Sequence, residues 1–430
     1  MNRIAKNAYW IIGCRVGQMI LSFIVSMLSA RYLGPSNYGL IQYASSLVAF
    51  VTPIMQLGFT NILVNELISD PRNEGSILGT AMVSCTCSAL VTMLGILLFA
   101  FLTSAGEKTA ILVCVLMSFS LLFSAFEMCQ YWFQAKLQSK YVSIISLISY
   151  IVVSCYKIYL LATQKSVYWF AFSYILDLML ISCSLMIIYR RLGGQKLAFS
   201  FELAKKMFGR SKHYIVAGLL VSVFAQTDRI MLYNMVDSAA AGHYSAAVTC
   251  AGLVTFVFAA IIDSFSPVIL ESRLKDIVLF ELNMKKLYSI IIYMSFMVCI
   301  VMTLGAGLII DITYGKDYYS AVGALRIMTW YTSFSYLGVA RNVWILAEKK
   351  QKYLWVLNLS GALANVILNY LLIPSMGING AALATLMTQF IANVAIGFVM
   401  KPVRRGHILM LQACKPRILV DAVKGLVARR

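Results

Sequence analysis

Nine ionisable side chains lie inside long apolar runs of this 430-residue chain, where a charged group is energetically unfavourable. They are Lys157, Asp177, Asp228, Arg229, Arg15, Glu127, Asp263, Arg326 and Arg341. A charge at the centre of a bilayer costs about 2.5 to 3.5 kcal/mol on an insertion scale, so these groups are expected to face protein or water. The first four lie several residues from either end of their runs and are the stronger functional candidates. The last three lie near an end, where a charged group can stay in contact with the headgroups.

Several of these charges belong to polar stripes, because residues three or four apart share one face of a helix. The stripes are Arg15, Gln18, Ser22, Ser26 and Ser29; Ser120, Ser124, Glu127, Tyr131 and Gln134; and Ser222, Gln226, Arg229 and Tyr233. Polar stripes on many helices predict a shared hydrated cavity. The alternative is hydrogen bonding between helices in a packed bundle, which explains single Ser and Thr residues better than it explains Arg15 and Arg229.

The usual motifs of nucleotide hydrolysis and metal binding are missing from the sequence. Gly315 and Lys316 lack the preceding glycine loop and the following Ser or Thr of a phosphate-binding loop. The three histidines form no HExxH motif or other metal cluster. We therefore expect no catalytic residue, no metal and no organic cofactor.

The apolar runs are each long enough to cross a membrane. A helix rises about 1.5 Å per residue and the hydrocarbon core is roughly 30 Å thick, so about 20 apolar residues suffice. Hydrophobic residues make up 60% of the chain, which excludes a soluble domain. Because hydrocarbon offers no partners to the backbone, the runs are predicted to be helices of an all-α integral membrane protein. The predicted spans are residues 9–30, 40–63, 77–103, 110–133, 142–162, 167–189, 214–236, 244–266, 287–310, 322–346, 354–373 and 378–400.

The distribution of Lys and Arg predicts how these helices are oriented. Basic residues concentrate in alternate connections, which include both termini. The opposite connections hold only Arg31, Lys108, Lys165 and Lys316. By the positive-inside rule both termini are therefore cytoplasmic. This topology and contact with anionic headgroups explain the net charge of +19, so nucleic-acid binding is not expected.

A weak internal repeat divides the chain into two related halves. The repeated positions, 212 residues apart, are Trp132, Ala135, Lys140 and Tyr141 in one half and Trp344, Ala347, Lys352 and Tyr353 in the other. Two halves of equal orientation predict two six-helix bundles around a central cavity, although ancestry alone would also explain the repeat. We assign residues 1–189 and 214–400 to the bundles, 190–213 to a basic amphipathic linker, and 401–430 to a basic cytoplasmic tail.

Four short motifs occur in order along the chain. They are residues 33–39 (LGPSNYG), residues 228–230 (DRI), Tyr314 and Gly315 with Tyr318, and residues 373–385 (IPSMGINGAALAT). Each motif alone is weak, but the series resembles the polysaccharide repeat-unit flippases of the O-antigen type. That family belongs to the multidrug, oligosaccharidyl-lipid and polysaccharide exporter superfamily. The resemblance implies two six-helix lobes that alternate between inward-facing and outward-facing states.

This resemblance also implies a transporter and not an enzyme. The substrate would be an undecaprenyl-diphosphate-linked oligosaccharide, moved from the inner to the outer leaflet of a bacterial cytoplasmic (inner) membrane for O-antigen and lipopolysaccharide synthesis. Membrane lipids, a polysaccharide polymerase and a chain-length regulator are the further partners expected. Arg binds phosphate oxygens in a forked geometry, which suits a diphosphate. The predicted headgroup and cavity residues are Arg15, Gln18, Glu127, Gln134, Lys157, Gln226, Arg229 and Arg326.

Other functions fit parts of the sequence. A multidrug or peptidoglycan-precursor lipid exporter of the same superfamily is the nearest alternative, although the cations favour an anionic substrate. A membrane-embedded glycan polymerase or ligase is expected to carry an extended outer loop, which is absent, and a structural scaffold would not need charges along several spans.

Energy coupling is a separate prediction. Without a nucleotide site, net transport needs an ion gradient or removal of the product. Asp177 and Asp228 are the carboxylates farthest from both surfaces and are the predicted sites for H+ or Na+. The alternative is a carboxylate that only pairs with Lys157 or an arginine to hold the bundle together.

Overall fold

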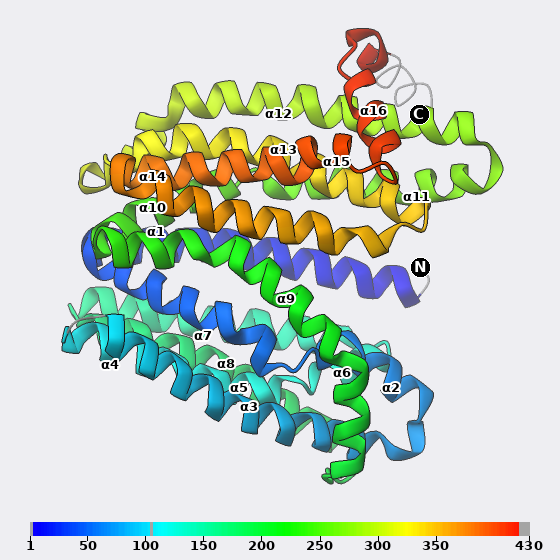
Figure 1. Cartoon of the computed structure of the whole chain (residues 1–430). Coiled ribbons are helices and arrows are strands. Elements are labelled where there is room, and N and C mark those ends of the chain that lie inside the picture. Colours follow the sequence, from blue (N-terminus) through cyan, green and yellow to red (C-terminus); the bar gives the residue numbers. More distant parts are fainter. Residues whose placement is uncertain (1–2, 104–105, 421–430) are drawn as a thin grey trace. The chain divides into compact units, whose positions relative to one another are not determined.

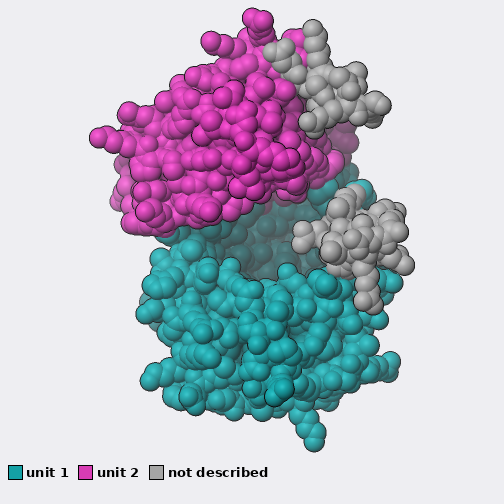
Figure 2. Space-filling view, turned by 90° about the vertical axis from the view of Figure 1, so that its right-hand side faces the viewer, with its two compact units in different colours: residues 1–234 teal, residues 235–430 magenta. Residues whose placement is uncertain are grey.

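The computed structural model of the chain describes residues 3–103 and 106–420, with side chains from residue 17 onward (Figure 1). Within these ranges every regular element is a helix, so the all-α class predicted from the sequence is confirmed. The chain forms two compact units, Met1–Asn234 and Met235–Arg430, which Figure 2 shows in teal and magenta.

The helices of each unit follow one another along the chain, mostly through short connections. In the first unit they are α1 (Arg3–Met55), α2 (Leu63–Ser69), α3 (Glu74–Thr103), α4 (Lys108–Ser118), α5 (Ser120–Glu127), α6 (Gln130–Ala135), α7 (Ser139–Ala162), α8 (Val167–Arg191) and α9 (Phe201–Met235). In the second unit they are α10 (Ser238–Gly252), α11 (Thr255–Lys275), α12 (Ile277–Thr313), α13 (Ala321–Ala347), α14 (Leu354–Phe390), α15 (Ile396–Val399) and α16 (Arg404–Gln412).

Helix α9 groups with the first unit, although the sequence analysis assigned the seventh span to the second half. It begins within the predicted linker and then lies along the second part of α1. The Ser211 hydroxyl donates a hydrogen bond to the Leu57 carbonyl at 2.6 Å. Farther along, the rings of Tyr233 and Tyr43 stack with their centroids 3.8 Å apart. These contacts place the boundary between the units after α9 rather than before it.

Two of the long helices are broken at glycines in conformations that other residues rarely adopt. Gly34 has φ 72° and ψ 169° inside α1, and Gly377 has φ 55° and ψ −127° inside α14. The hydroxyls of Ser26 and Tyr38 are 3.0 Å apart across the first break. Twelve residues of straight helix would separate them by about 18 Å, so the chain reverses direction at Gly34.

Nine helical segments of the described residues are long and apolar enough to cross a membrane. Two of them, Gly17–Met55 and Gln351–Val399, contain the glycine breaks, so each covers two predicted spans. The predicted span 244–266 is divided between α10 and α11, and 322–346 is α13, which is not among the nine. The multi-pass membrane class is confirmed, and the count of about 12 stays a prediction.

The repeated sequence positions adopt the same local structure in both units. Helix α6 ends at Ala135 and α13 at Ala347. Two residues later, Leu137 and Lys349 have φ of 55° and 54°, which is a left-handed helix ending. The same ending closes α7 at Gln164, so it is a common turn as well as a feature of the repeat. The sequence repeat therefore coincides with equivalent helix ends.

The first half of the predicted linker is an extended segment that we call the strap, residues 192–200, and it lies directly on α3. The Gly75 amide donates to the Gln195 side-chain oxygen at 3.0 Å, and the Ala198 amide donates to the Gly75 carbonyl at 3.3 Å. A Cβ atom on Gly75 would lie 2.3 Å from the Lys196 carbonyl, and one on Gly79 would lie 2.5 Å from the Ala198 carbonyl. Glycine at both positions lets the two backbones touch.

The second half of the predicted linker is the beginning of α9. It carries exposed basic residues, as the sequence suggested, and it buries Met207 and Ser211 against the rest of the unit. The segment 190–213 is therefore not one amphipathic element. The strap is held by α3, because the backbone groups of an extended chain need hydrogen-bond partners. The residues at the start of α9 instead belong to a long helix that continues into the membrane-crossing segment.

Replacing Gly79 by Ala is expected to destabilise the first unit. The added Cβ meets backbone atoms of the strap, and overpacking of this kind costs about 1 to 3 kcal/mol. Gly95→Ala on the same helix is the matched control, because its Cβ would meet nothing within 4 Å. Thermal unfolding in detergent should show a lower Tm for Gly79→Ala only. Equal melting of the two variants would contradict the close packing of strap and helix.

The first part of the predicted tail, which contains α16, packs into the second unit. The His407 ring occupies the space beside Gly397, where a Cβ would lie 1.9 Å from it, and its Nε2 is 3.2 Å from the Asn393 carbonyl. Arg341, which the sequence placed near the headgroups, is only 3% exposed and donates to the Ala392 carbonyl at 2.9 Å. Both acceptors lie in a π-helical segment, Ile391–Ala395. Arg341 therefore has an internal packing role.

Candidate functional site

Helices α7 and α8 form a hairpin that carries two of the predicted charged residues, Lys157 and Asp177. In the turn between them Gln164 has φ 50°, and the Lys165 amide donates to the Leu160 carbonyl at 3.1 Å. The two helices run antiparallel, so residues at similar distances from this turn lie opposite each other. Ser149 and Asp177 satisfy that condition and face each other across the hairpin.

A cavity of about 410 Å³ lies beside this hairpin. Its lining residues are Gln18, Met19, Ser22, Ser146, Tyr150, Asp177 and Ile181. The Ser149 hydroxyl donates to Asp177 Oδ1 at 2.8 Å, which holds the carboxylate in place. The Tyr150 hydroxyl lies within hydrogen-bonding reach of Ser22 on α1. Two of the predicted residues, Gln18 and Asp177, therefore share one polar cavity formed by α1, α7 and α8.

Lys157 lies on the same hairpin, two turns beyond Ser149 along α7. Its ammonium group is 5.0 Å from the centroid of the Tyr174 ring, a distance at which the ring attracts a cation. Lys157 and Asp177 attract each other electrostatically. Among the described side chains this pair does not approach within the 4.0 Å of an ion pair. Asp177 is therefore held by a hydroxyl rather than by a lysine.

Glu127 adds a second carboxylate to this region. It ends α5, is partly exposed, and is close enough to Asp177 for the two charges to repel each other. The pair therefore contributes two negative charges to the region of the cavity, with Lys157 as the nearby positive charge.

Helix α9 contributes a second cation. The Arg229 guanidinium donates to the Gln226 side-chain oxygen at 3.2 Å and interacts electrostatically with Tyr174. Tyr174 thus lies near both Lys157 and Arg229. Asp228, which directly precedes Arg229 in the sequence, is only 4% exposed and makes further contacts. The two adjacent charges therefore have different surroundings, as expected for residues about 100° apart on a helix.

The structure brings six of the ten predicted site residues together within the first unit. Gathered around the α7–α8 hairpin are Gln18, Glu127, Lys157, Asp177, Gln226 and Arg229. Gln134 is exposed at the end of α6, about two helical turns beyond Glu127. Arg326 is exposed on α13 of the second unit. The side chain of Arg15 lies outside the described residues.

Three residues of this site were not singled out from the sequence. They are Ser149, Tyr150 and Tyr174. The signal for the first two was available, because positions 143, 146, 149, 150, 154 and 157 form a polar stripe at helical spacing along α7. Tyr174 had no such signal, since a single tyrosine in an apolar helix is usually part of the packing.

Comparison with known proteins shows the family to which this chain belongs. A protein-family model described as polysaccharide biosynthesis protein matches residues 4–273, more than half of the chain. The chain belongs to the polysaccharide biosynthesis protein family. The capsular polysaccharide biosynthesis protein CapF of Staphylococcus aureus is 23% identical over 413 residues, which cover 93% of this chain and 99% of that protein. The family match includes every residue gathered around the hairpin, and it does not include Arg326.

Solved structures show which fold this member of the family has. The lipid II flippase MurJ in an inward closed conformation has a TM-score of 0.70 and 17% identity, covering 94% of this chain and 90% of that chain. An inward-facing multidrug resistance MATE family transporter of the MOP superfamily has a TM-score of 0.65 and 12% identity, covering 92% and 95%. The family resemblance stated from the sequence is thereby confirmed, with the fold of MOP superfamily transporters.

Proposed function

We propose that this polysaccharide biosynthesis protein is a flippase for a lipid-linked oligosaccharide. The observation that carries the proposal is the polar cavity beside Asp177, with two cations near Tyr174, inside a unit built from apolar membrane-crossing helices. Family membership supports a role in polysaccharide synthesis, and the fold of transporters supports movement of a substrate rather than a reaction. The enzyme alternatives have no comparable support.

The chemistry of such a substrate suits the residues of the cavity. We take the substrate to be an undecaprenyl-diphosphate-linked repeat unit, which combines an anionic diphosphate with a polar glycan. Lys157 and Arg229 supply positive charge, and Gln18 and Tyr150 supply hydrogen-bonding groups for sugar hydroxyls. Arg15 remains part of the proposed headgroup site. The polymer is a surface polysaccharide, with O-antigen and capsule as the two candidates.

Coupling to an ion gradient is part of the proposal. Asp177 is the preferred ion site, because it lines the cavity, accepts a hydrogen bond from Ser149 and lies near a second carboxylate, Glu127. A carboxylate and a hydroxyl are suitable ligands for Na+, and the carboxylate alone can carry a proton. Asp228 is the second candidate. Alternating access would then expose Asp177 to each side in turn.

Reconstituted transport tests the proposed function. Proteoliposomes that contain only this protein would receive a labelled lipid-linked repeat unit, a lipid-linked peptidoglycan precursor or a cationic dye. We expect net movement of the repeat unit across the bilayer and little movement of the other two. Movement of the dye or the precursor at an equal rate would replace the proposal with the corresponding alternative. No movement of any substrate would reject the flippase function for the isolated chain.

We propose a bacterial cytoplasmic membrane location with both termini inside, where a polymerase and a chain-length regulator would be its partners. Cys414 offers a direct test because it is exposed beyond α16. In a variant that keeps only this cysteine, an impermeant maleimide should label permeabilised cells and leave intact cells unlabelled. A cysteine introduced at Lys316, in an opposite connection, is the control and should be labelled in both. Strong labelling of Cys414 in intact cells would reverse the topology.

A further inference from the structure

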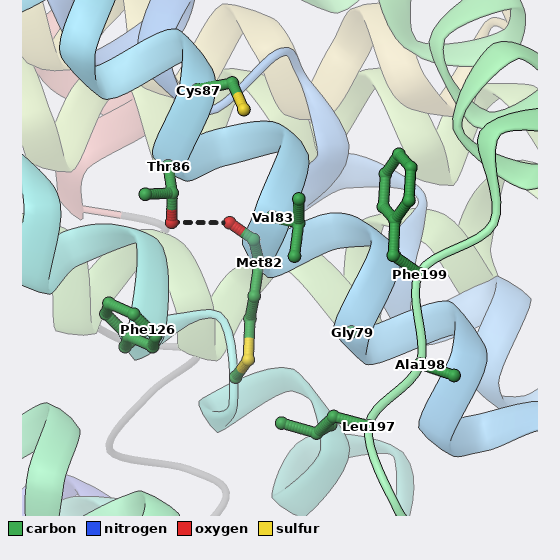
Figure 3. A pocket seen from close by; sticks show the side chains of 9 residues that line it. All are labelled: Gly79, Met82, Val83, Thr86, Cys87, Phe126, Leu197, Ala198 and Phe199. Atoms are coloured by element: carbon green, nitrogen blue, oxygen red, sulfur yellow. Dashed lines mark hydrogen bonds between the residues drawn. The ribbon is translucent and has the colours of Figure 1, made fainter.

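A second cavity, of about 300 Å³, lies between the strap and helices α3 and α5 (Figure 3). Its lining residues are Gly79, Met82, Val83, Thr86, Cys87, Phe126, Leu197, Ala198 and Phe199. Thr86 is the single hydroxyl-bearing residue in this lining, and it donates to the Met82 carbonyl of its own helix at 2.8 Å. Its polar group is therefore satisfied within the helix, and the cavity presents an apolar wall.

The strap forms one wall of this cavity, through its backbone contact with α3 and through the side chains that it directs toward the cavity. Its backbone touches α3 at Gly75 and Gly79, which fixes its distance from the helix. Side chains two apart in an extended segment share a face, and Leu197 and Phe199 lie on the side that borders the cavity. Both are more than a third exposed, so the chain itself leaves the groove partly open. An apolar surface of this kind indicates a binding partner.

The groove continues into the membrane-facing surface of α3. Its residues on that helix fall at positions 79, 82, 83, 86 and 87, which is one face of a helix. The same face then carries exposed apolar side chains at Leu90, Val91, Leu94, Leu97 and Leu98. Because α3 is one of the apolar membrane-crossing segments, these residues face hydrocarbon. The groove is therefore open to lipid chains along its length.

Basic residues flank the strap along the chain, and we call them the basic rim. They are Arg190 and Arg191 at the end of α8, Lys196 in the strap, and Lys205 and Lys206 at the start of α9, all exposed. Lys196 adjoins the groove residue Leu197. An apolar groove beside this basic rim matches a lipid with a hydrocarbon chain and an anionic headgroup.

An occupant of this groove must be narrow, because the cavity of about 300 Å³ is bounded by the strap on one side and by α3 and α5 on the other. A hydrocarbon chain is narrow and flexible enough to lie along it. We propose that the groove binds one acyl chain of an anionic membrane phospholipid, with the headgroup at the basic rim. The lipid would fill the space between strap and α3, independently of the transported substrate.

A photoactivatable phosphatidylglycerol with a diazirine in its acyl chain tests this proposal in bilayers containing the full chain. We expect adducts concentrated on the peptides that contain residues 79–87 and 197–199. Val83→Phe fills the groove and should lower these adducts several-fold. Val152→Phe, at a similarly exposed valine on α7 that does not line the groove, should leave them unchanged. Both positions are exposed enough to accept the ring, and equal melting temperatures would establish that both variants fold.

A phosphatidylcholine probe with the same chain tests the headgroup part. It should label the groove less than phosphatidylglycerol, and replacing Lys196, Lys205 and Lys206 by Gln should remove the difference. Equal labelling of the Val83→Phe variant and the parent protein, or adducts spread evenly along α3, would overturn the site. Equal labelling by both lipids would overturn the anionic headgroup. A cross-link to a second protein chain would replace the lipid with a protein partner.

Discussion

The Asp177→Asn variant is expected to lose the stimulation of substrate flux by an imposed proton or sodium gradient. The amide cannot exchange a proton at physiological pH and binds a cation weakly, while it keeps the size of the side chain and the hydrogen bond from Ser149. Coupling free energies are typically about 1 to 3 kcal/mol, so the stimulation should fall by about 5- to 150-fold. Flux in proteoliposomes with and without each gradient measures the effect.

Asp263→Asn is the matched control for this variant. Asp263 is an exposed carboxylate on α11, so its replacement should leave the gradient dependence unchanged. Asp228→Asn separates the two candidate ion sites, and it should keep the dependence if Asp177 is the site. Retention of full gradient dependence by both the Asp177 and the Asp228 variants would remove ion coupling through these carboxylates.

The second large effect is expected at Arg229. Its replacement by Gln removes a cation from the proposed headgroup site, and hydrogen bonds to charged groups contribute about 1.5 to 3 kcal/mol. Export of the lipid-linked repeat unit should therefore fall by about 10- to 100-fold, which corresponds to that free energy. Arg229→Lys should recover part of the loss, because it restores the charge without the forked geometry. Export at matched protein abundance in the membrane is the measurement.

Arg326→Gln provides the comparison for Arg229→Gln. Arg326 is exposed on α13 of the second unit and is not among the residues gathered within the first unit, so its loss should reduce export little. Lys157→Gln should resemble Arg229→Gln, since both cations lie near Tyr174. A larger defect at Arg326 than at Arg229 would place the headgroup site elsewhere and reject this assignment.

Several features followed from the sequence because they depend on the composition of single segments. A segment that crosses the hydrocarbon core must satisfy its own backbone hydrogen bonds, as a long helix does. The apolar runs therefore predicted an all-α membrane protein before any contact was known. The cost of a buried charge likewise selected Lys157, Asp177 and Arg229 as candidates. The positions of the breaks were also marked, since Gly34 precedes Pro35 and Gly377 follows Pro374 by three residues.

Other features depended on which helix faces which, and single-segment patterns do not contain that information. A polar stripe shows that residues share a face, but not what the face contacts, so Gln134 was grouped with the cavity residues although it is exposed at the end of α6. Tyr174 belongs to the site only because Lys157 and Arg229 approach it from other helices. The role of α9 in the first unit likewise depends on contacts with distant residues such as Leu57.

The sequence by itself determined the membrane class, the approximate positions of the helices and the charged residues within the spans that are candidates for a functional role. Each of these is a property of local composition measured against the bilayer as a solvent. Only the tertiary structure decided that Ser149 holds Asp177, that glycines let the strap lie on α3, and that a groove remains between them. These features arise from packing between segments far apart in the chain, where a single Cβ atom or hydroxyl decides whether two backbones can meet.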